Sequence, residues 1–249
     1  MEQTIGQRMP TYFLSHGGGP WPWMDGPFRD AYTDLEASLK EMPGQVGTKP
    51  TAILMISGHW IERDFTVMTS PAPGMLYDYG GFPAHTYHIR YGAPGSPRLA
   101  ERVRTLLAGA GFGVGEDSER GFDHGAFVPL AVAYPKADIP VVQLSLRADF
   151  DPTTHLNAGR ALSVLRDEGI LIVGSGLSYH NLRRFDARAA EPSHQFDGWL
   201  RRTVLESPPE GRVGGLLQWA QAPSARLAHP MEDHLIPLMV AAGAAEKDP

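Results

Sequence analysis

The hydrophobic positions of the chain fall into four short runs that predict buried β-strands. The runs are almost continuously apolar, and Gly, Pro or Ser residues lie close to their ends. They are Thr11–Leu14, Ala52–Ile56, Val141–Leu146 and Leu171–Val173. Because strands of this kind are buried on both faces, the pattern favours a parallel sheet that helices cover on both sides.

Longer stretches of mixed polarity predict helices after these strands. Two of them begin with an N-cap residue followed by proline, and the third has a proline in its first turn, where it is tolerated. The three stretches are Arg98–Gly109, Thr153–Arg166 and His234–Gly243. Alternating strands and helices are typical of an α/β layer structure.

The segment 71–97 contains too many turn-forming residues for a helix, and we expect an elaborated loop there with one strand at Tyr87–Tyr91. No internal repeat, heptad pattern or long linker divides the chain. We therefore predict one α/β domain over residues 1–249, with a central, mostly parallel sheet flanked by helices on both faces.

Composition and charge exclude several kinds of protein. A net charge of −6 and a pI of about 5.9 argue against nucleic acid or an anionic membrane as the main partner. The absence of cysteine excludes disulfides, thiolate ligands and a cysteine nucleophile, and it suits a reducing compartment. No stretch approaches the ~18 apolar residues of a membrane span, and Met1–Pro10 lacks the apolar core of a signal peptide. We expect a cytoplasmic protein.

Three histidines come just past the carboxyl ends of predicted strands, the edge where ligands bind in open α/β sheets. His16 follows the first strand, His59 the second and His180 the last, each with glycines nearby. Imidazole is the commonest metal ligand and suits iron, zinc, copper and nickel. A single loop histidine usually has only a surface or hydrogen-bonding role. Three at one edge give a metal site equal weight with that ordinary role.

Other histidines and other chemistries fit less well. His155 and His194 lie in polar helical stretches and are expected outside the site, whereas His85 and His88 lie in the aromatic loop and are candidates for a pocket wall. No GxSxG nucleophile elbow occurs, which disfavours an α/β-hydrolase. No Walker A or GxGxxG motif occurs in a strand–turn–helix context, which disfavours a nucleotide or flavin cofactor.

Five short motifs follow one another along the chain, and together they carry a family resemblance. They are Ser15–Pro20, Ser57–Trp60, Gly121–Gly125, Gly174–Leu182 and His229–Leu238. In this order and spacing they resemble the class III extradiol ring-cleaving dioxygenases, in particular the DOPA 4,5-dioxygenase-like branch. The resemblance extends from Pro10 to Ala245 and implies a single-domain α/β fold.

The resemblance also implies a non-haem Fe(II) site that cleaves catechols beside the diol. His16 and His59 match two metal ligands of the family, and His234 matches the third, with Glu232 as a second candidate for that position. His180 matches a histidine that serves either as the active-site base or as a further metal ligand. His124 matches a residue outside the ligand set, beside the substrate and oxygen. Zn(II) can occupy a site with the same donor atoms.

The expected partners are a small aromatic diol and O₂, and the sequence favours neither a monomer nor a homo-oligomer. The diol is a DOPA-like or other substituted catechol, and the product is a ring-opened semialdehyde. Tyr77, Tyr79, Phe82 and His85 are candidates for an aromatic-binding wall, with an exposed glycine-rich loop as the alternative. A zinc-dependent hydrolase and a non-catalytic metal-binding protein on the same scaffold are the alternative functions.

Overall fold

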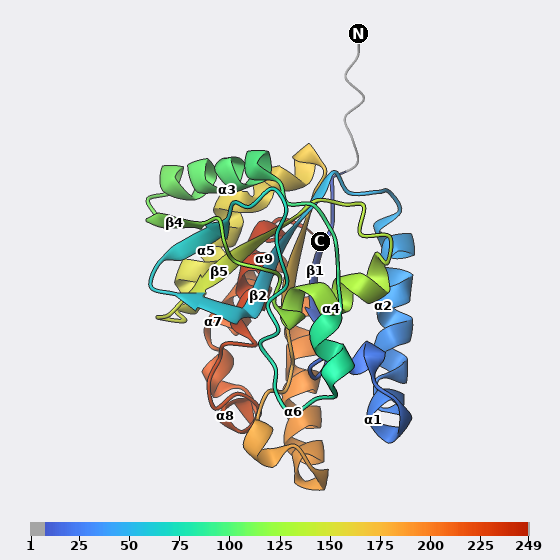
Figure 1. Ribbon diagram of the computed structural model, residues 1–249. Helices are drawn as coiled ribbons and strands as arrows, with labels where there is room; N and C mark the ends of the chain where they lie inside the picture. Colours follow the sequence, from blue (N-terminus) through green and yellow to red (C-terminus); the bar gives the residue numbers. More distant parts are fainter. Residues whose placement is uncertain (1–7, 249) are drawn as a thin grey trace.

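Six strands form the central sheet of the computed structural model, which describes residues 8–248 (Figure 1). Their order across the sheet is β1-β6-β2-β5-β3-β4. The strands are β1 (Thr11–Ser15), β2 (Ala52–Glu62), β3 (Phe65–Met68), β4 (Val114–Asp117), β5 (Val141–Arg147) and β6 (Ile170–Gly176). The four predicted apolar runs are the cores of β1, β2, β5 and β6, which are mutually parallel where they pair.

The remaining two strands, β3 and β4, extend the sheet at one edge. β3 pairs antiparallel with β5 through Val67 and Leu144, and it pairs parallel with β4. The sheet is therefore mostly parallel, as expected. The strand expected at Tyr87–Tyr91 is wrong: the chain forms a 3₁₀ turn over Ala84–His88 instead.

Nine α-helices surround the sheet in the part of the chain that the structure describes. They are α1 (Gly26–Asp30), α2 (Thr33–Val46), α3 (Pro97–Gly109), α4 (His124–Ala133), α5 (Pro152–Leu162), α6 (Ala190–Arg201), α7 (Pro209–Leu217), α8 (Ala225–Ala228) and α9 (Ile236–Ala244). The three predicted helices correspond to α3, α5 and α9. The second ends earlier than expected, because the chain tightens into a 3₁₀ turn over Ser163–Glu168.

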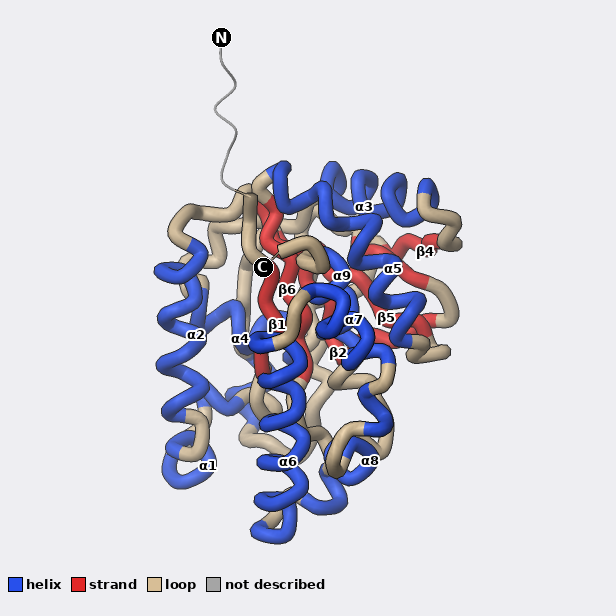
Figure 2. Tube along the Cα trace, turned by 180° about the vertical axis from the view of Figure 1, so that it is seen from behind, coloured by secondary structure: helices blue, strands red, loops and turns tan. Residues whose placement is uncertain are grey.

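Helices cover both faces of the sheet because the side chains of its central strand alternate between two cores. Leu54 and Ile56 of β2 pack in one core with residues of α3, α5 and α9, whereas Ile53 and Met55 pack in the other with residues of α2 and α4. Figure 1 shows α2 and α4 together on one side of the sheet. Figure 2 shows α7 on the opposite side, beside β1 and β6, with α6 extending below the strands.

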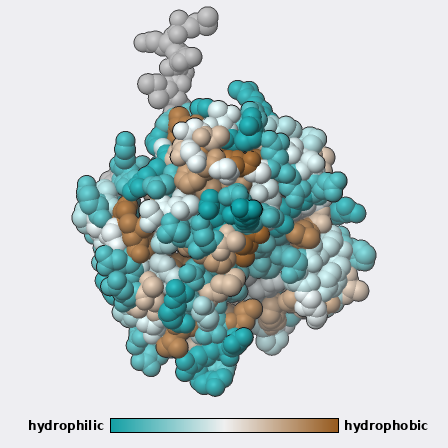
Figure 3. Space-filling model, turned by 90° about the vertical axis from the view of Figure 1, so that its left-hand side faces the viewer, coloured by the Kyte–Doolittle hydropathy of each residue, from teal (hydrophilic) through white to brown (hydrophobic). Residues whose placement is uncertain are grey.

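Among the described residues, no helix has the length and apolar character needed to cross a bilayer. The face shown in Figure 3 is mostly hydrophilic, with only scattered hydrophobic residues. The expectation about a signal peptide falls largely on residues 1–7, which lie outside the described residues, and the domain limits 1–249 stay a prediction.

Candidate metal centre

Three histidines from distant parts of the chain bring their ring nitrogens together at the end of the sheet where the parallel strands have their carboxyl ends. His16 directly follows β1, His59 lies in β2, and His234 precedes α9. The Nε2 atom of His59 lies 3.1 Å from Nε2 of His16 and 3.1 Å from Nε2 of His234. The three nitrogens thus face one small space, at the end of the sheet where β1 and β6 finish.

His59 reaches this space through an irregularity in β2. The strand does not end at Ile56, as expected from the apolar run, but continues to Glu62. Its pairing with β5 shifts register between Ile56 and Ile61, and His59 lies within that interval. A bulge of this kind bends a strand and redirects one side chain, which places the imidazole at the site although it belongs to the sheet.

The second ring nitrogen of each histidine faces an oxygen atom behind it. His234 Nδ1 lies 2.8 Å from Asp233 Oδ2, His59 Nδ1 lies 3.3 Å from Asp78 Oδ2, and His16 Nδ1 lies 3.1 Å from Ser175 Oγ. Ionised carboxylates only accept hydrogen bonds. The Ser175 hydroxyl donates its one hydrogen to the Gly125 carbonyl at 2.5 Å, so it too accepts from His16. All three rings therefore favour the proton on Nδ1 and leave Nε2 as a lone pair.

Burial keeps these three imidazoles neutral at physiological pH. It lowers the pKa of His16 well below the ordinary value, with further lowering by the neighbouring histidines, and it lowers the pKa of His59 to about 2. Burial also lowers the pKa of His234, against the opposing effect of Asp233. Neutral rings whose lone pairs converge repel one another unless a cation lies between them, so the cluster has the chemistry of a metal site.

A glycine in β6 allows the His234 segment to approach this closely. A Cβ atom built on Gly176 would lie 2.0 Å from the carbonyl oxygen of His234, far inside van der Waals contact. That carbonyl accepts a hydrogen bond from Leu177 N–H at 3.0 Å. Because glycine has no side chain, the protein's own backbone can approach the strand at Gly176.

His124 and His180 lie against the cluster on two sides. The His124 ring centroid is 4.0 Å from that of His59, and its Nδ1 lies 2.8 Å from Asp78 Oδ1. The His180 ring stacks on His234 with centroids 3.4 Å apart, and its Nδ1 lies 3.7 Å from Asp233 Oδ1. His180 thus groups with Asp233 and His234, whereas His16, His59 and His234 form a group of three histidines whose ligand atoms all lie within 4.8 Å of one another.

The other candidate for the third ligand lies in a different interaction. Glu232 pairs with Arg226, with 2.7 Å between Oε2 and Nη1. The structure therefore brings His234, and not Glu232, to His16 and His59.

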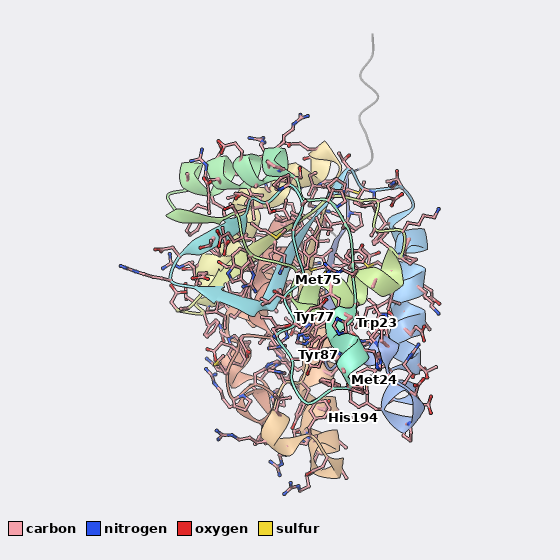
Figure 4. The ribbon with its side chains drawn as sticks, viewed as in Figure 1. Trp23, Met24, Met75, Tyr77, Tyr87 and His194 are labelled. Atoms are coloured by element: carbon pink, nitrogen blue, oxygen red, sulfur yellow. The ribbon has the colours of Figure 1, made fainter. Side chains whose placement is uncertain are left out.

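The remaining histidines lie outside the cluster. His155 is fully buried, accepts a hydrogen bond from Arg147 N–H and contacts the Asp151 carbonyl, which is a packing role. His194 is exposed on α6, below the labelled aromatic residues in Figure 4. His85 and His88 are exposed as well.

The aromatic segment that follows β3 lies beside His124. Tyr79 lies 5.8 Å from His124 between ring centroids and 5.5 Å from Phe82. Tyr77 and Tyr87, labelled in Figure 4, are 6.2 Å apart. The hydroxyls of Tyr77 and Tyr79 donate to carbonyls of their own segment, so the rings present apolar faces. The aromatic-binding wall of Tyr77, Tyr79, Phe82 and His85 stays a prediction; the first three side chains are half-buried, and His85 is exposed.

Two tryptophans next to the first two histidines belong to the core. Trp21 is completely buried and donates from Nε1 to the His16 carbonyl at 2.9 Å. Trp60 is buried beneath the Arg120 guanidinium, 4.4 Å from its ring. Both therefore pack beneath the site and do not form its walls.

Sequence reasoning missed three residues of the site. Asp78, Asp233 and Ser175 hold the Nδ1 atoms described above, and none was a candidate. Asp233 had a usable signal, because it directly precedes His234 in the last motif. Asp78 had a weaker one, an isolated acid between Tyr77 and Tyr79 in the aromatic segment.

The fold and this cluster define an α/β protein with a three-histidine site suited to one metal ion. Residues 10–249 match the family described as the catalytic LigB subunit of aromatic ring-opening dioxygenase. The chain belongs to this family, the class III extradiol ring-cleaving dioxygenases, in its DOPA-dioxygenase-like branch. It is an extradiol ring-cleaving dioxygenase, which disfavours the hydrolase and the non-catalytic binding protein considered above.

Individual relatives resemble the chain over nearly its whole length. It is 42% identical over 243 residues to the 4,5-DOPA dioxygenase extradiol of Beta vulgaris, covering 94% of this chain and 86% of that protein. It is 34% identical to the protein of the same name from Escherichia coli (strain K12), covering 95% and 85%. A crystal structure of an uncharacterized protein from Escherichia coli K12 superposes with a TM-score of 0.71 at 33% identity, covering 95% and 89%.

Proposed function

We propose that the protein cleaves a substituted catechol beside its diol with Fe(II) held by His16, His59 and His234. The metal assignment rests on the convergence of three Nε2 lone pairs. Each imidazole ring is oriented by an oxygen atom that faces its Nδ1 atom. Two nitrogens bound at about 2.1 Å and at right angles to each other lie about 3 Å apart. The two Nε2 separations of 3.1 Å fit this requirement.

Three neutral protein ligands suit the proposed chemistry. When bound, Fe(II) supplies a Lewis acid that favours the deprotonated diol and open positions for the catecholate and O₂. Because the three ligands carry no charge, the site retains the full charge of the ion, which strengthens its attraction for a catecholate. Cleavage inserts both oxygen atoms of O₂ and opens the ring to a semialdehyde.

The protein's own proton carriers are His124 and His180. His124 donates from Nδ1 to the Asp78 carboxylate, so its Nε2 atom is free to accept a proton from a catechol hydroxyl. His180 stacks on a proposed ligand with its Nδ1 toward Asp233, in a position to accept and return a proton as the ring opens. We assign His180 the role of acid–base group rather than ligand, because its ring lies parallel to that of His234 and outside the three-nitrogen set.

The aromatic residues beside His124 fit an aromatic substrate. Tyr79 and Phe82 present ring faces that can stack with a catechol ring at the distances that aromatic pairs favour. The relatives named for DOPA act on that catechol, and we infer that a DOPA-like or other substituted catechol is also the substrate here. We keep the cytoplasm as the proposed location, because a chain without cysteine suits a reducing compartment.

Oxygen uptake on metal-loaded protein tests this proposal. Protein stripped of metal and loaded anaerobically with Fe(II) is expected to consume one O₂ per catechol and to produce a yellow ring-opened product. The same protein loaded with Zn(II) is the matched control and is expected to bind the catechol without consuming O₂. If the iron-loaded protein consumes no O₂ with any of a panel of substituted catechols, the proposal is wrong.

A further inference from the structure

Two carboxylates at the site each face two histidines through opposite oxygen atoms. Asp78 places Oδ2 3.3 Å from His59 Nδ1 and Oδ1 2.8 Å from His124 Nδ1. Asp233 places Oδ2 2.8 Å from His234 Nδ1 and Oδ1 3.7 Å from His180 Nδ1. In each set one histidine belongs to the converging three and the other lies beside them.

We propose that Asp78 and Asp233 are positioning residues, each of which links one proposed metal ligand to one proposed acid–base histidine. This inference rests on the metal assignment proposed above. A carboxylate that only accepts hydrogen bonds directs the Nδ1 proton of both rings toward itself. The ligand ring then turns a lone pair on Nε2 to the metal, and the acid–base ring turns a lone pair on Nε2 to the substrate.

Asp78 comes from the aromatic segment and not from the sheet, so it also ties that segment to the site. Its Oδ1 accepts a second hydrogen bond, from the backbone N–H of His124 at 3.0 Å. Its neighbours Tyr77 and Tyr79 are held by carbonyls of Ile89 and Thr86. The carboxylate therefore has a fixed position, which is what orienting two rings at once requires.

Only one carboxylate oxygen of Asp233, Oδ2, lies within hydrogen-bonding distance of a histidine. Its Oδ1 is buried, and among the described residues no donor lies within hydrogen-bonding distance of it. The nearest candidate is His180 Nδ1, at 3.7 Å. Acid–base hydrogen bonds are often long without substrate and shorten when it binds. The unpaired oxygen thus marks the position toward which His180 moves.

The two carboxylates predict different effects on metal binding when each aspartate is replaced by asparagine. In Asp78→Asn the amide oxygen stays with the two donors of His124, so the NH₂ group faces His59 Nδ1. Such a donor favours the His59 tautomer with its proton on Nε2, the atom that faces the metal. In Asp233→Asn the amide oxygen stays with His234, the closer partner, and the NH₂ group faces His180. The first substitution weakens metal binding, and the second disturbs only proton transfer.

Anaerobic titration with Co(II), followed by its visible absorption bands, tests the inference without turnover. Asp78→Asn is expected to weaken Co(II) binding by about 10- to 100-fold, the usual effect of losing a ligand's supporting partner. Asp78→Ala, which offers no donor, is expected to weaken it less. Asp233→Asn is expected to bind Co(II) within about threefold of the wild type, while its iron-loaded form loses kcat with KM nearly unchanged.

Asp64→Asn is the matched control, because this carboxylate pairs with Arg147 at the surface and is expected to leave Co(II) binding unchanged. Urea unfolding of each metal-free variant shows whether it is folded. The inference is overturned if Asp78→Asn binds Co(II) as tightly as Asp64→Asn, or if Asp78→Ala binds more weakly than Asp78→Asn. A wild-type protein that binds no Co(II) would instead refute the proposed metal site itself.

Discussion

Gly176→Ala introduces one methyl group where β6 meets the His234 segment. The new Cβ would lie 2.0 Å from the His234 carbonyl oxygen and 2.9 Å from its carbonyl carbon, whereas ordinary contact begins at 3.4 Å. The backbone at His234 must therefore move by about 1.4 Å, or β6 must move by the same amount. Both neighbours are main chain, so neither can relax by rotating a side chain.

The expected loss of stability follows from the steric contact between the added Cβ atom and the His234 carbonyl group. Overpacking of a rigid interior costs about 1–3 kcal/mol, and the hydrogen bond from Leu177 N–H to the His234 carbonyl contributes about 1 kcal/mol more. We expect the free energy of unfolding to fall by roughly 2–4 kcal/mol. Because a shift of this size is comparable with a metal–nitrogen bond of about 2.1 Å, we also expect Co(II) binding to weaken at least tenfold.

Urea unfolding of the metal-free protein and Co(II) titration measure these two effects separately. Gly44→Ala is the matched control, because Gly44 lies in α2 with no atom within 4 Å of the added Cβ. Alanine there is expected to stabilise the protein by about 0.5–1 kcal/mol and to leave Co(II) binding unchanged. If Gly176→Ala is as stable as the wild type, the steric reasoning is refuted. If it is less stable but binds Co(II) normally, the link from this contact to the ligand is refuted.

Three further predictions concern the histidines and the metal. His124→Ala and His180→Ala are each expected to keep Co(II) binding but to lose about 100-fold or more in kcat with iron; unchanged turnover in either variant contradicts its assigned role. His229 is completely buried, with its Nε2 atom 3.0 Å from the Ser178 carbonyl oxygen, and this burial lowers its pKa to about 4, below the ~6.5 of an unfolded chain. The unfolded state therefore binds more protons between these values, and the stability present above about pH 6.5 is lost as the pH falls toward 4, by up to roughly 3 kcal/mol. The difference in unfolding free energy between wild type and His229→Gln is expected to shrink over this range, and a constant difference would count against the assignment. Removing iron with a chelator is expected to lower the thermal midpoint, since a ligand at about 100 times its Kd stabilises a protein by about 2.7 kcal/mol; an unchanged midpoint would mean that the metal binds the folded state no more tightly than the unfolded chain.

The parallel strands β1, β2, β5 and β6 could be predicted because strands that are buried on both faces have almost continuously apolar sequences. β1, β2, β5 and β6 contain short, almost continuously apolar runs with Gly, Pro or Ser close to their ends. β3 and β4 extend the sheet at one edge. β4 (Val114–Asp117) is half polar, so its sequence contains no continuous apolar run. β3 depends on its pairing with β5, and β4 on its pairing with β3, and such pairing is a property of the fold and not of the segment.

Of the nine α-helices in the described residues, only α3, α5 and α9 were predicted with bounds; among the others, α4 and α2 were missed for different physical reasons. α4 is buried on nearly all sides, so its sequence has no polar face and resembles an apolar run with a proline in it. α2 contains Pro43 and Gly44 near its end, residue types that usually interrupt a helix, although this helix continues to Val46. The 3₁₀ turn at Ala84–His88 was mistaken for a strand because its aromatic residues favour strands when packing is unknown.

The histidines of the site could be predicted from the sequence, but the residues that orient them could not. His16 and His59 stand out because imidazole beside glycine at a strand end is unusual chemistry for a loop. Asp78 is an ordinary acid in an irregular segment, and only the three-dimensional path of that segment brings it to His59 and His124. Sequence thus indicates which groups perform the chemistry, whereas the groups that orient them emerge only when distant segments are folded together.

The order in which the histidines occur along the chain constrains how the protein is made. His16 and His59 are 43 residues apart, and His234 follows His59 by another 175. A ribosome therefore releases two of the three nitrogens long before the third, and no nascent chain that ends before His234 can form the site. Metal loading at this site is consequently a late event in biosynthesis, and a truncated product that ends before His234 cannot compete with the full chain for metal through these three nitrogens.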